Sequence, residues 1–296
     1  MSWCRQAGLE LSVAKTQLMQ FAGKPIDLKE IKLYGETVET TESVKYLGVV
    51  LDRGLRFKQH LKQIERKANV LINCTSWYLR AEHTLHYAEK MMLYKCVFLP
   101  TLLYGWQIWS HALDYEVNRR TLRRLQRRFL INILGAYRTI SYDCTYELTD
   151  TVAIDLEVAY RQVCQIKLTE ENRAPDKEEK KDYRATIREE QRKFFRERSR
   201  VKVKDEIDYR SELTKEMVYI MSAHGPMQKY LADRRLAEDP TCRLCLEEDE
   251  DVAHFQAGCP GLDFTLNVTI EDENQLTEFR YKCKELFRRL RGAATN

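Results

Sequence analysis

The sequence has no long uncharged apolar run and only a small excess of positive charge. Its longest apolar stretch, Cys96 to Trp109, is shorter than the roughly 20 residues of a membrane-spanning helix and includes Pro100 and Gln107. The first residues, Met-Ser-Trp-Cys-Arg, do not start a signal-peptide core. We therefore expect an intracellular protein. Because the net charge is only +4, a nucleic-acid partner must be judged from the distribution of charge.

The composition indicates a folded protein with much charged surface. Apolar residues make up 44% and charged residues 32%, the latter above the usual quarter, so long solvated helices or a polyanion-binding surface are expected. In an intracellular protein the nine cysteines should be thiols or metal ligands, not disulfides. Six lack ligand-like spacing and are expected to be core thiols: Cys4, Cys74, Cys96, Cys144, Cys164 and Cys283.

Apolar periodicity predicts a β-rich start followed by helices. Alternation at Leu9, Leu11 and Val13 predicts a strand, a hairpin is expected around Gly35, and 45–51 is expected to be one further strand. After Phe57 the period changes, and Leu61, Ile64, Ala68, Leu71 and Ile72 form one apolar face. Further helices are expected at 85–98, 114–134 (ending at Gly135), 154–168, 173–210 (a solvated linker), 211–236 and 271–291.

Four metal-ligand residues lie close together near the C-terminus. Cys242, Cys245, His254 and Cys259 are separated by two, eight and four residues, which is the pattern of a zinc knuckle. All four positions carry good zinc ligands, so the spacing predicts a closed structural Zn site. The ion would supply much of the folding free energy, since the segment has no room for a core of its own. The alternative is unrelated buried cysteines and a surface histidine.

An acidic run lies inside this knuckle. Residues 247–251 are all Glu or Asp and would repel phosphate. A nucleic-acid contact would then need Arg243 with Arg234 and Arg235. Otherwise the knuckle only stabilises the fold.

Six arginines come as pairs four residues apart: Arg119, Arg120, Arg123, Arg124, Arg127 and Arg128. On a helix this spacing gives a two-wide basic stripe, opposite an apolar face, with little acid nearby beyond Asp114 and Glu116. The stripe predicts phosphate binding, and Arg123→Ala with Arg127→Ala should weaken nucleic-acid affinity and its salt dependence. The alternative is a solvated face paired with acids from elsewhere in the fold.

Several segments, in order over residues 1–262, resemble non-LTR reverse transcriptases of the jockey-like and insect ribosomal-DNA-inserting types. The segment from Trp3 to Thr16 resembles the part that follows the catalytic Asp-Asp motif. The matching blocks after it are 45–60, 100–109, 126–141 and 223–231, and the Cys-Cys-His-Cys knuckle follows. Ala223 departs from the family's usual Gly.

The resemblance implies an α+β, mostly α fold. It would comprise a small β-rich palm remnant (1–55), a helical thumb (56–170), a charged helical linker and helix (171–236), the zinc knuckle (237–265) and a C-terminal helix and tail (266–296). It also implies residue roles. Lys15 would be a general acid that protonates pyrophosphate, unless it is an ordinary surface lysine. Tyr46 and Gly48 would grip the primer terminus, unless they form a buried strand.

The resemblance further implies an RNA-directed DNA polymerase, whose parent polyprotein is also an endonuclease. Such a protein would act on template RNA and primer DNA in a ribonucleoprotein of the cytoplasm and nucleus, with Mg²⁺ held by catalytic aspartates. The sequence has no Tyr/Phe-x-Asp-Asp motif, so we do not expect this chain alone to polymerise. Two alternatives stay open: a non-catalytic nucleic-acid-binding remnant, and a zinc-stapled interaction protein.

Overall fold

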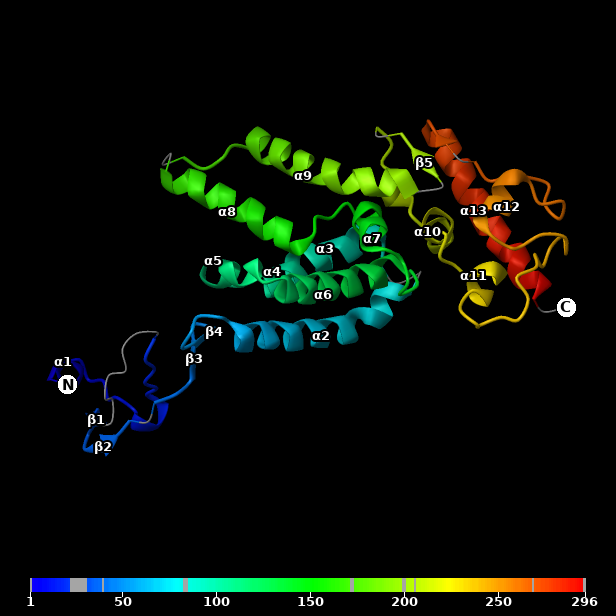
Figure 1. The fold of residues 1–296 in the computed structure, drawn as a ribbon. Helices are drawn as coiled ribbons and strands as arrows, with labels where there is room; N and C mark the ends of the chain where they lie inside the picture. The colour runs from blue at the N-terminus through cyan, green and yellow to red at the C-terminus, as the bar shows by residue number, and fades with distance from the viewer. Residues whose placement is uncertain are drawn as a thin grey trace.

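The computed structural model describes residues 2–21, 31–38, 40–81, 85–170, 173–198, 201–204, 206–267 and 269–294. Figure 1 shows a small N-terminal part, a central body of helices and a C-terminal part at the opposite end. Helices dominate, and every sheet in the described residues has two strands, so the predicted mostly-α, α+β class is confirmed.

The N-terminal part holds α1 (Ser2–Gln6), η1 (Val13–Lys15) and a hairpin of β1 (Lys32–Leu33) and β2 (Glu36–Thr37). The hairpin around Gly35 is confirmed. The strand expected from the alternation at 9–13 is wrong. Leu9 and Leu11 are exposed and have no neighbouring strand to pair with among the described residues, so alternation alone did not make a sheet.

The single strand expected at 45–51 is also wrong, because the chain reverses within it. β3 (Ser43–Tyr46) pairs antiparallel with β4 (Val49–Asp52). Between them Leu47 and Gly48 both have positive φ, 44° and 86°, which makes the two-residue hairpin turn that such angles favour.

The helical core is built on α2 (Lys58–Arg80) packed against α6 (Glu116–Leu134). Leu61, Ile64, Ala68 and Ile72 are buried as predicted, although Leu71 is only partly so. α6 ends at Gly135 as predicted, with φ 62°. The segments between them are α3 (Tyr87–Leu93), the π-helix η3 (Tyr94–Phe98), α4 (Leu99–Leu102), α5 (Trp106–Trp109) and η4 (Ser110–Asp114).

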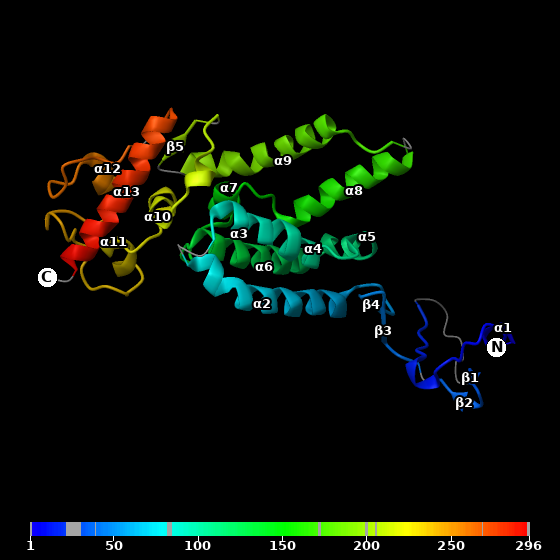
Figure 2. The ribbon, with the colours of Figure 1, turned by 180° about the vertical axis from the view of Figure 1, so that it is seen from behind.

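Next come α7 (Tyr142–Thr149), α8 (Ile154–Glu170) and α9 (Lys177–Arg198). The charged segment 173–210 does contain a helix, but α9 is not a detached linker: it turns back along α8 and reaches α7 (Figure 2). The guanidinium of Arg184 lies 4.7 Å from the ring centre of Tyr160 and 3.6 Å from Glu157. The strongly charged α9 is therefore held against α8 partly by one of its own basic side chains.

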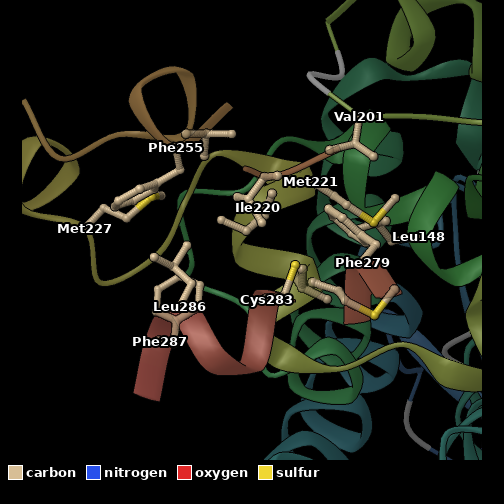
Figure 3. Packing of buried hydrophobic residues seen from close by; sticks show 14 of the residues in the cluster. Leu148, Val201, Ile220, Met221, Met227, Phe255, Phe279, Cys283, Leu286 and Phe287 are labelled. Carbon is tan, nitrogen blue, oxygen red and sulfur yellow. The ribbon is translucent and has the colours of Figure 1, made fainter. Parts of the chain in front are cut away.

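The C-terminal part has a second hydrophobic core (Figure 3). Its elements are the parallel pair β5 (Lys202–Val203) and β6 (Thr269–Ile270), then η5 (Tyr209–Glu212), α10 (Lys215–Ser222), α11 (Gln228–Ala232), α12 (Val252–Ala257) and α13 (Glu273–Ala293). The single helix expected at 211–236 is wrong. α10 stops at Ala223, which has φ 55°, and Pro226 follows before α11 begins.

The cysteines are all free, as expected. Cys144 and Cys283 are buried core thiols, and Cys283 lies among the residues of Figure 3. Cys4 and Cys164 are intermediate in exposure. For Cys74 and Cys96 the prediction is wrong, because both are exposed on the outer faces of helices.

Candidate metal centre and nucleic-acid interface

Four ligand side chains converge as the spacing predicts. Atoms from Cys242, Cys245, His254 and Cys259 lie within 4.8 Å of one another. Sγ of Cys242 is 3.8 Å from Sγ of Cys259, and Sγ of Cys245 is 3.4 Å from Nε2 of His254. A tetrahedral ion with metal–sulfur bonds of about 2.3 Å separates its sulfurs by about 3.8 Å. The cluster therefore has the dimensions of a closed four-ligand site.

The surroundings orient the histidine and favour a bound cation. Asp251 caps α12 by accepting the backbone N–H of His254 at 2.9 Å. Glu248 lies 2.9 Å from Nδ1 of the same ring, which leaves Nε2 facing the thiols. Burial raises the pKa of the Cys242 thiol to about 12. A thiolate at that position is therefore stable at neutral pH only beside a cation.

The acidic run is used inside the fold. Glu250 is fully buried, and its carboxylate accepts hydrogen bonds from Arg243, 2.9 Å from Nε and 2.5 Å from a terminal nitrogen. It also accepts the backbone N–H of Gln228 at 2.9 Å. Lys229 lies 3.0 Å from Asp249 and 3.4 Å from Asp251. Arg243 is thus held by Glu250 and is not directed outward for phosphate.

The metal-binding unit, residues 237–265, is not a free-standing knuckle. Cys242, Val252, Phe255 and Cys259 belong to the second hydrophobic core, which also includes α10 and α13. The segment thus has no core of its own, as expected, but its buried residues pack in a core that it shares with α10 and α13. Within the unit the chain packs closely at Gly261, where a Cβ would lie 2.7 Å from the backbone of Leu244.

The first three arginines of the α6 stripe are paired with acids. Glu116 accepts from Arg119 and from Arg120, at 2.8 Å each. The guanidinium of Arg123 donates two hydrogen bonds to the carboxylate of Asp155 on α8, and the one from Nε to Oδ1 is 2.6 Å long. Asp155 is largely buried, so this pair also fixes α8 against α6. The acids that pair with this half of the stripe are thus Glu116 on α6 itself and, from elsewhere in the fold, Asp155.

The other three arginines face a different environment. Arg124 lies 2.9 Å from Glu65 of α2, whereas Arg128 donates to the neutral amide oxygen of Asn69 at 2.5 Å. Arg127 donates to the carbonyls of Arg138 and Ile140 and lies 4.8 Å from the ring centre of Tyr142. Arg127 therefore holds the turn between α6 and α7, so a variant that removes Arg123 and Arg127 would perturb the fold as well as binding.

A groove of about 860 Å³ lies between α2 and α6. One wall is the stripe Asn73, Ser76, Trp77 and Arg80, and the other is Arg124, Arg127, Arg128 and Ile131. Each stripe has the spacing i, i+3, i+4, i+7 of one helix face. Asn132 and Arg138 also line the groove. Among the described lining residues there are five arginines and no acid.

Sequence reasoning missed Trp77, Arg80 and Arg138 as members of this site. Arg80 donates to the side-chain oxygen of Asn132 at 2.8 Å, across the two helices. The available signal was the pair of i, i+3, i+4, i+7 stripes on α2 and α6. It becomes meaningful only once these two helices are known to face each other.

None of Lys15, Tyr46 and Gly48 lines the groove, and Lys15 lies on a different element from the other two. Lys15 is exposed at the end of η1. Tyr46 is 64% exposed in the β3–β4 turn, so the buried-strand alternative is wrong. A Cβ on Gly48 would lie 2.9 Å from the ring of Tyr104, whose hydroxyl donates to the Leu47 carbonyl at 2.9 Å. The close neighbour of Gly48 is thus this protein's own Tyr104, and the roles of Lys15, Tyr46 and Gly48 stay predictions.

None of the described helices combines the length and the apolar character that a bilayer crossing requires.

Comparison with known proteins gives relatives of one kind. The RNA-directed DNA polymerase from mobile element jockey of Drosophila funebris is 29% identical over 145 residues, 48% of this chain and 16% of that polymerase. The probable RNA-directed DNA polymerase from transposon BS of Drosophila melanogaster is 31% identical over 152 residues, 51% of the chain and 16% of the relative. A Pol polyprotein from type-1 retrotransposable element R1 2 of Nasonia vitripennis is 24% identical over 285 residues, 87% of the chain and 69% of that polyprotein.

The chain thus spans about a sixth of the length of the jockey and BS polymerases that it matches. No known protein-family model matches it. No solved structure matches it. The homologues of this chain are therefore the RNA-directed DNA polymerases and Pol polyproteins of jockey- and R1-type non-LTR retrotransposons.

Proposed function

We propose that this chain is a nucleic-acid-binding portion of a retrotransposon RNA-directed DNA polymerase, which holds template RNA and primer DNA during target-primed reverse transcription. The observation that carries the proposal is the groove between α2 and α6, lined by five arginines with no acid among its described lining residues. The homologues named above are polymerases of this kind. The parent polyprotein would add the endonuclease and the Mg²⁺-binding aspartates.

The proposed phosphate-binding set consists of Arg80, Arg128 and Arg138, because Arg124 already has Glu65 as a carboxylate partner. Arg80 and Arg128 have neutral amide partners, and so keep their full charge toward a ligand. The binding of a polyanion by such guanidinium groups releases counterions, so affinity falls as salt rises. Arg119, Arg120 and Arg123 already have carboxylate partners, and we expect less from them.

The proposed ion of the Cys-Cys-His-Cys cluster is Zn²⁺. Three thiols and one imidazole are the donors that this ion prefers, and the distances fit a tetrahedron. Because every ligand position is filled by protein, the ion would be structural and would activate no water. It would join the loop at 242–245 to α12 and so complete the second core.

The test is binding of the purified chain to an RNA–DNA hybrid and to structured RNA, with two double variants that remove equal charge. Arg128→Ala with Arg138→Ala should weaken binding on the order of tenfold at about 0.1 M salt. The matched control, Arg119→Ala with Arg120→Ala, should change affinity less, because both side chains are hydrogen-bonded to Glu116 and neither lines the groove. If the wild-type chain binds neither ligand at low salt, a zinc-stapled interaction protein becomes the better account.

A further inference from the structure

An exposed tryptophan stands on the wall of the arginine groove. Trp77 is 68% exposed near the C-terminal end of α2, and Tyr78 beside it is 53% exposed. Trp77 does not belong to the buried face of α2, whose last members are Ile72 and Leu79. It lies instead on the same helical stripe as Asn73 and Arg80, which line the groove. Its large apolar ring is therefore presented to whatever the groove binds.

The groove combines this ring with positive charge that few acids offset. Arg124 alone of the stripe that faces Trp77 has a carboxylate partner, Glu65. Arg128 and Arg80 hydrogen-bond to amide oxygens. Arg138 is exposed, and no described residue forms an ion pair with its guanidinium. A ligand that supplies both anionic groups and a flat aromatic surface would satisfy the ring and the charges together.

Single-stranded nucleic acid has this chemistry. Its bases offer flat faces that stack on tryptophan, and its phosphates pair with arginine. In a duplex the faces of internal bases are covered by their neighbours, so no internal base could stack on this ring. The volume of about 860 Å³ is within the range of about 300–1,000 Å³ of small-ligand sites, which suits a nucleotide-sized group.

We propose that Trp77 stacks on an unpaired base of a single-stranded nucleic acid whose phosphates lie against Arg80, Arg128 and Arg138. This inference rests on the proposed function, because it assumes that the arginine groove binds nucleic acid. It adds a preference for an unpaired segment over a duplex. Stacking is insensitive to base identity, so the site would bind without sequence specificity.

The experiment uses the full chain, a 15-nucleotide oligo-deoxythymidylate and a blunt duplex of similar length. Trp77→Leu should weaken binding of the single strand by about 5- to 100-fold, and Trp77→Phe should restore most of it. Binding of the duplex should stay unchanged in both variants. The matched control is Trp3→Leu, since Trp3 is equally exposed, at 68%, and lies in the N-terminal part.

A second readout follows the indole directly. In a Trp3→Phe background, the remaining tryptophans besides Trp77 are Trp106 and Trp109, which are buried. Oligo-deoxythymidylate should therefore quench the exposed fraction of the fluorescence, and the duplex should not.

The outcomes separate this inference from the proposed function. If Trp77→Leu leaves single-strand binding unchanged while Arg128→Ala with Arg138→Ala still weakens it, stacking is refuted and the proposed function stands. Equal weakening for single strand and duplex would also refute stacking. If the arginine pair has no effect on any nucleic acid, both fail. In that case, saturable quenching of Trp77 by an uncharged apolar peptide would identify the groove as a protein-docking surface.

Discussion

The metal-binding unit and the groove use charge in opposite ways. In the unit, the acidic run is paired internally: Glu250 is buried against Arg243, and Lys229 lies between Asp249 and Asp251. Along the groove, Arg80 and Arg128 rest on neutral amides and keep their charge toward solvent. A zinc knuckle is the usual first candidate for nucleic-acid contact, but here its charges stabilise the fold. The difference is why we propose a structural role for the metal-binding unit and nucleic-acid binding for the groove.

α6 shows the same contrast within one helix. In its first half, Arg119 and Arg120 share one carboxylate, Glu116, and Arg123 is paired with Asp155. Its second half faces α2 across the groove, where Glu65 is the one acid that pairs with it in the described structure. Equal sequence spacing therefore does not mean equal function, since the neighbouring elements decide which guanidinium groups are available.

Loss of the proposed metal ion should give the largest effect. Cys259→Ser deletes one ligand at a buried position of the second core, and we expect the free energy of unfolding to fall by more than about 3 kcal/mol. Chemical denaturation and bound-zinc analysis would measure it. Cys74→Ser is the control, because Cys74 is exposed and away from the cluster. A Cys259→Ser protein that is as stable as the wild type would contradict a structural role for the ion.

Acid should act next on the helical core through His60. This side chain is buried, and its Nδ1 accepts the Val50 N–H at 3.3 Å. Burial, and then the charge of Lys67, lower its pKa from 6.5 to about 4. The unfolded chain therefore takes up the proton first, and the stability present above pH 6.5 falls between pH 6.5 and about 4, by up to about 3 kcal/mol.

The measurement is urea unfolding at several pH values, followed by the fluorescence of Trp106 and Trp109, which report on the helical core. In His60→Gln the free energy of unfolding should change less with pH within this window than it does in the wild type. If this pH dependence is the same in His60→Gln as in the wild type, the acid sensitivity comes from protonation of the proposed metal ligands instead.

A small gain in stability is expected at Ala223. Ala223 ends α10 with φ 55°, a left-handed conformation that strains a side chain with a Cβ. Ala223→Gly should raise the melting temperature slightly, for a gain of about 0.5–1 kcal/mol, and leave nucleic-acid affinity unchanged. A loss of stability would show that the packing of the Ala223 methyl group stabilises the protein more than its left-handed backbone destabilises it.

Features set by local spacing were predictable from the sequence. The four metal ligands, the arginine helix and its end at Gly135 each depend on residues a few positions apart, and local geometry decides them. The break after α10 also had a local signal, Gly225-Pro226, which the apolar periodicity of 211–236 obscured. The alternation at Leu9 and Leu11 misled because a strand also needs a neighbour.

Features set by tertiary contacts were not predictable. The partner of Arg123 is Asp155, on another helix, and that of Arg124 is Glu65, on a third. The groove exists because α2 packs on α6, which places Trp77 and Arg80 opposite Arg128. No spacing along the chain encodes that arrangement, so the available arginines could not be told from the paired ones.

The most direct test of the central claim is the salt dependence of single-strand affinity in three proteins. They are the wild type, Arg128→Ala with Arg138→Ala in the groove, and Arg234→Ala with Arg235→Ala beside the metal-binding unit. Each lost phosphate contact lowers the slope of log affinity against log salt by about 0.7. We predict a decrease of about 1.4 for the groove variant and no change for the other. The reverse result would place the phosphate contacts on the metal-binding unit and contradict this account.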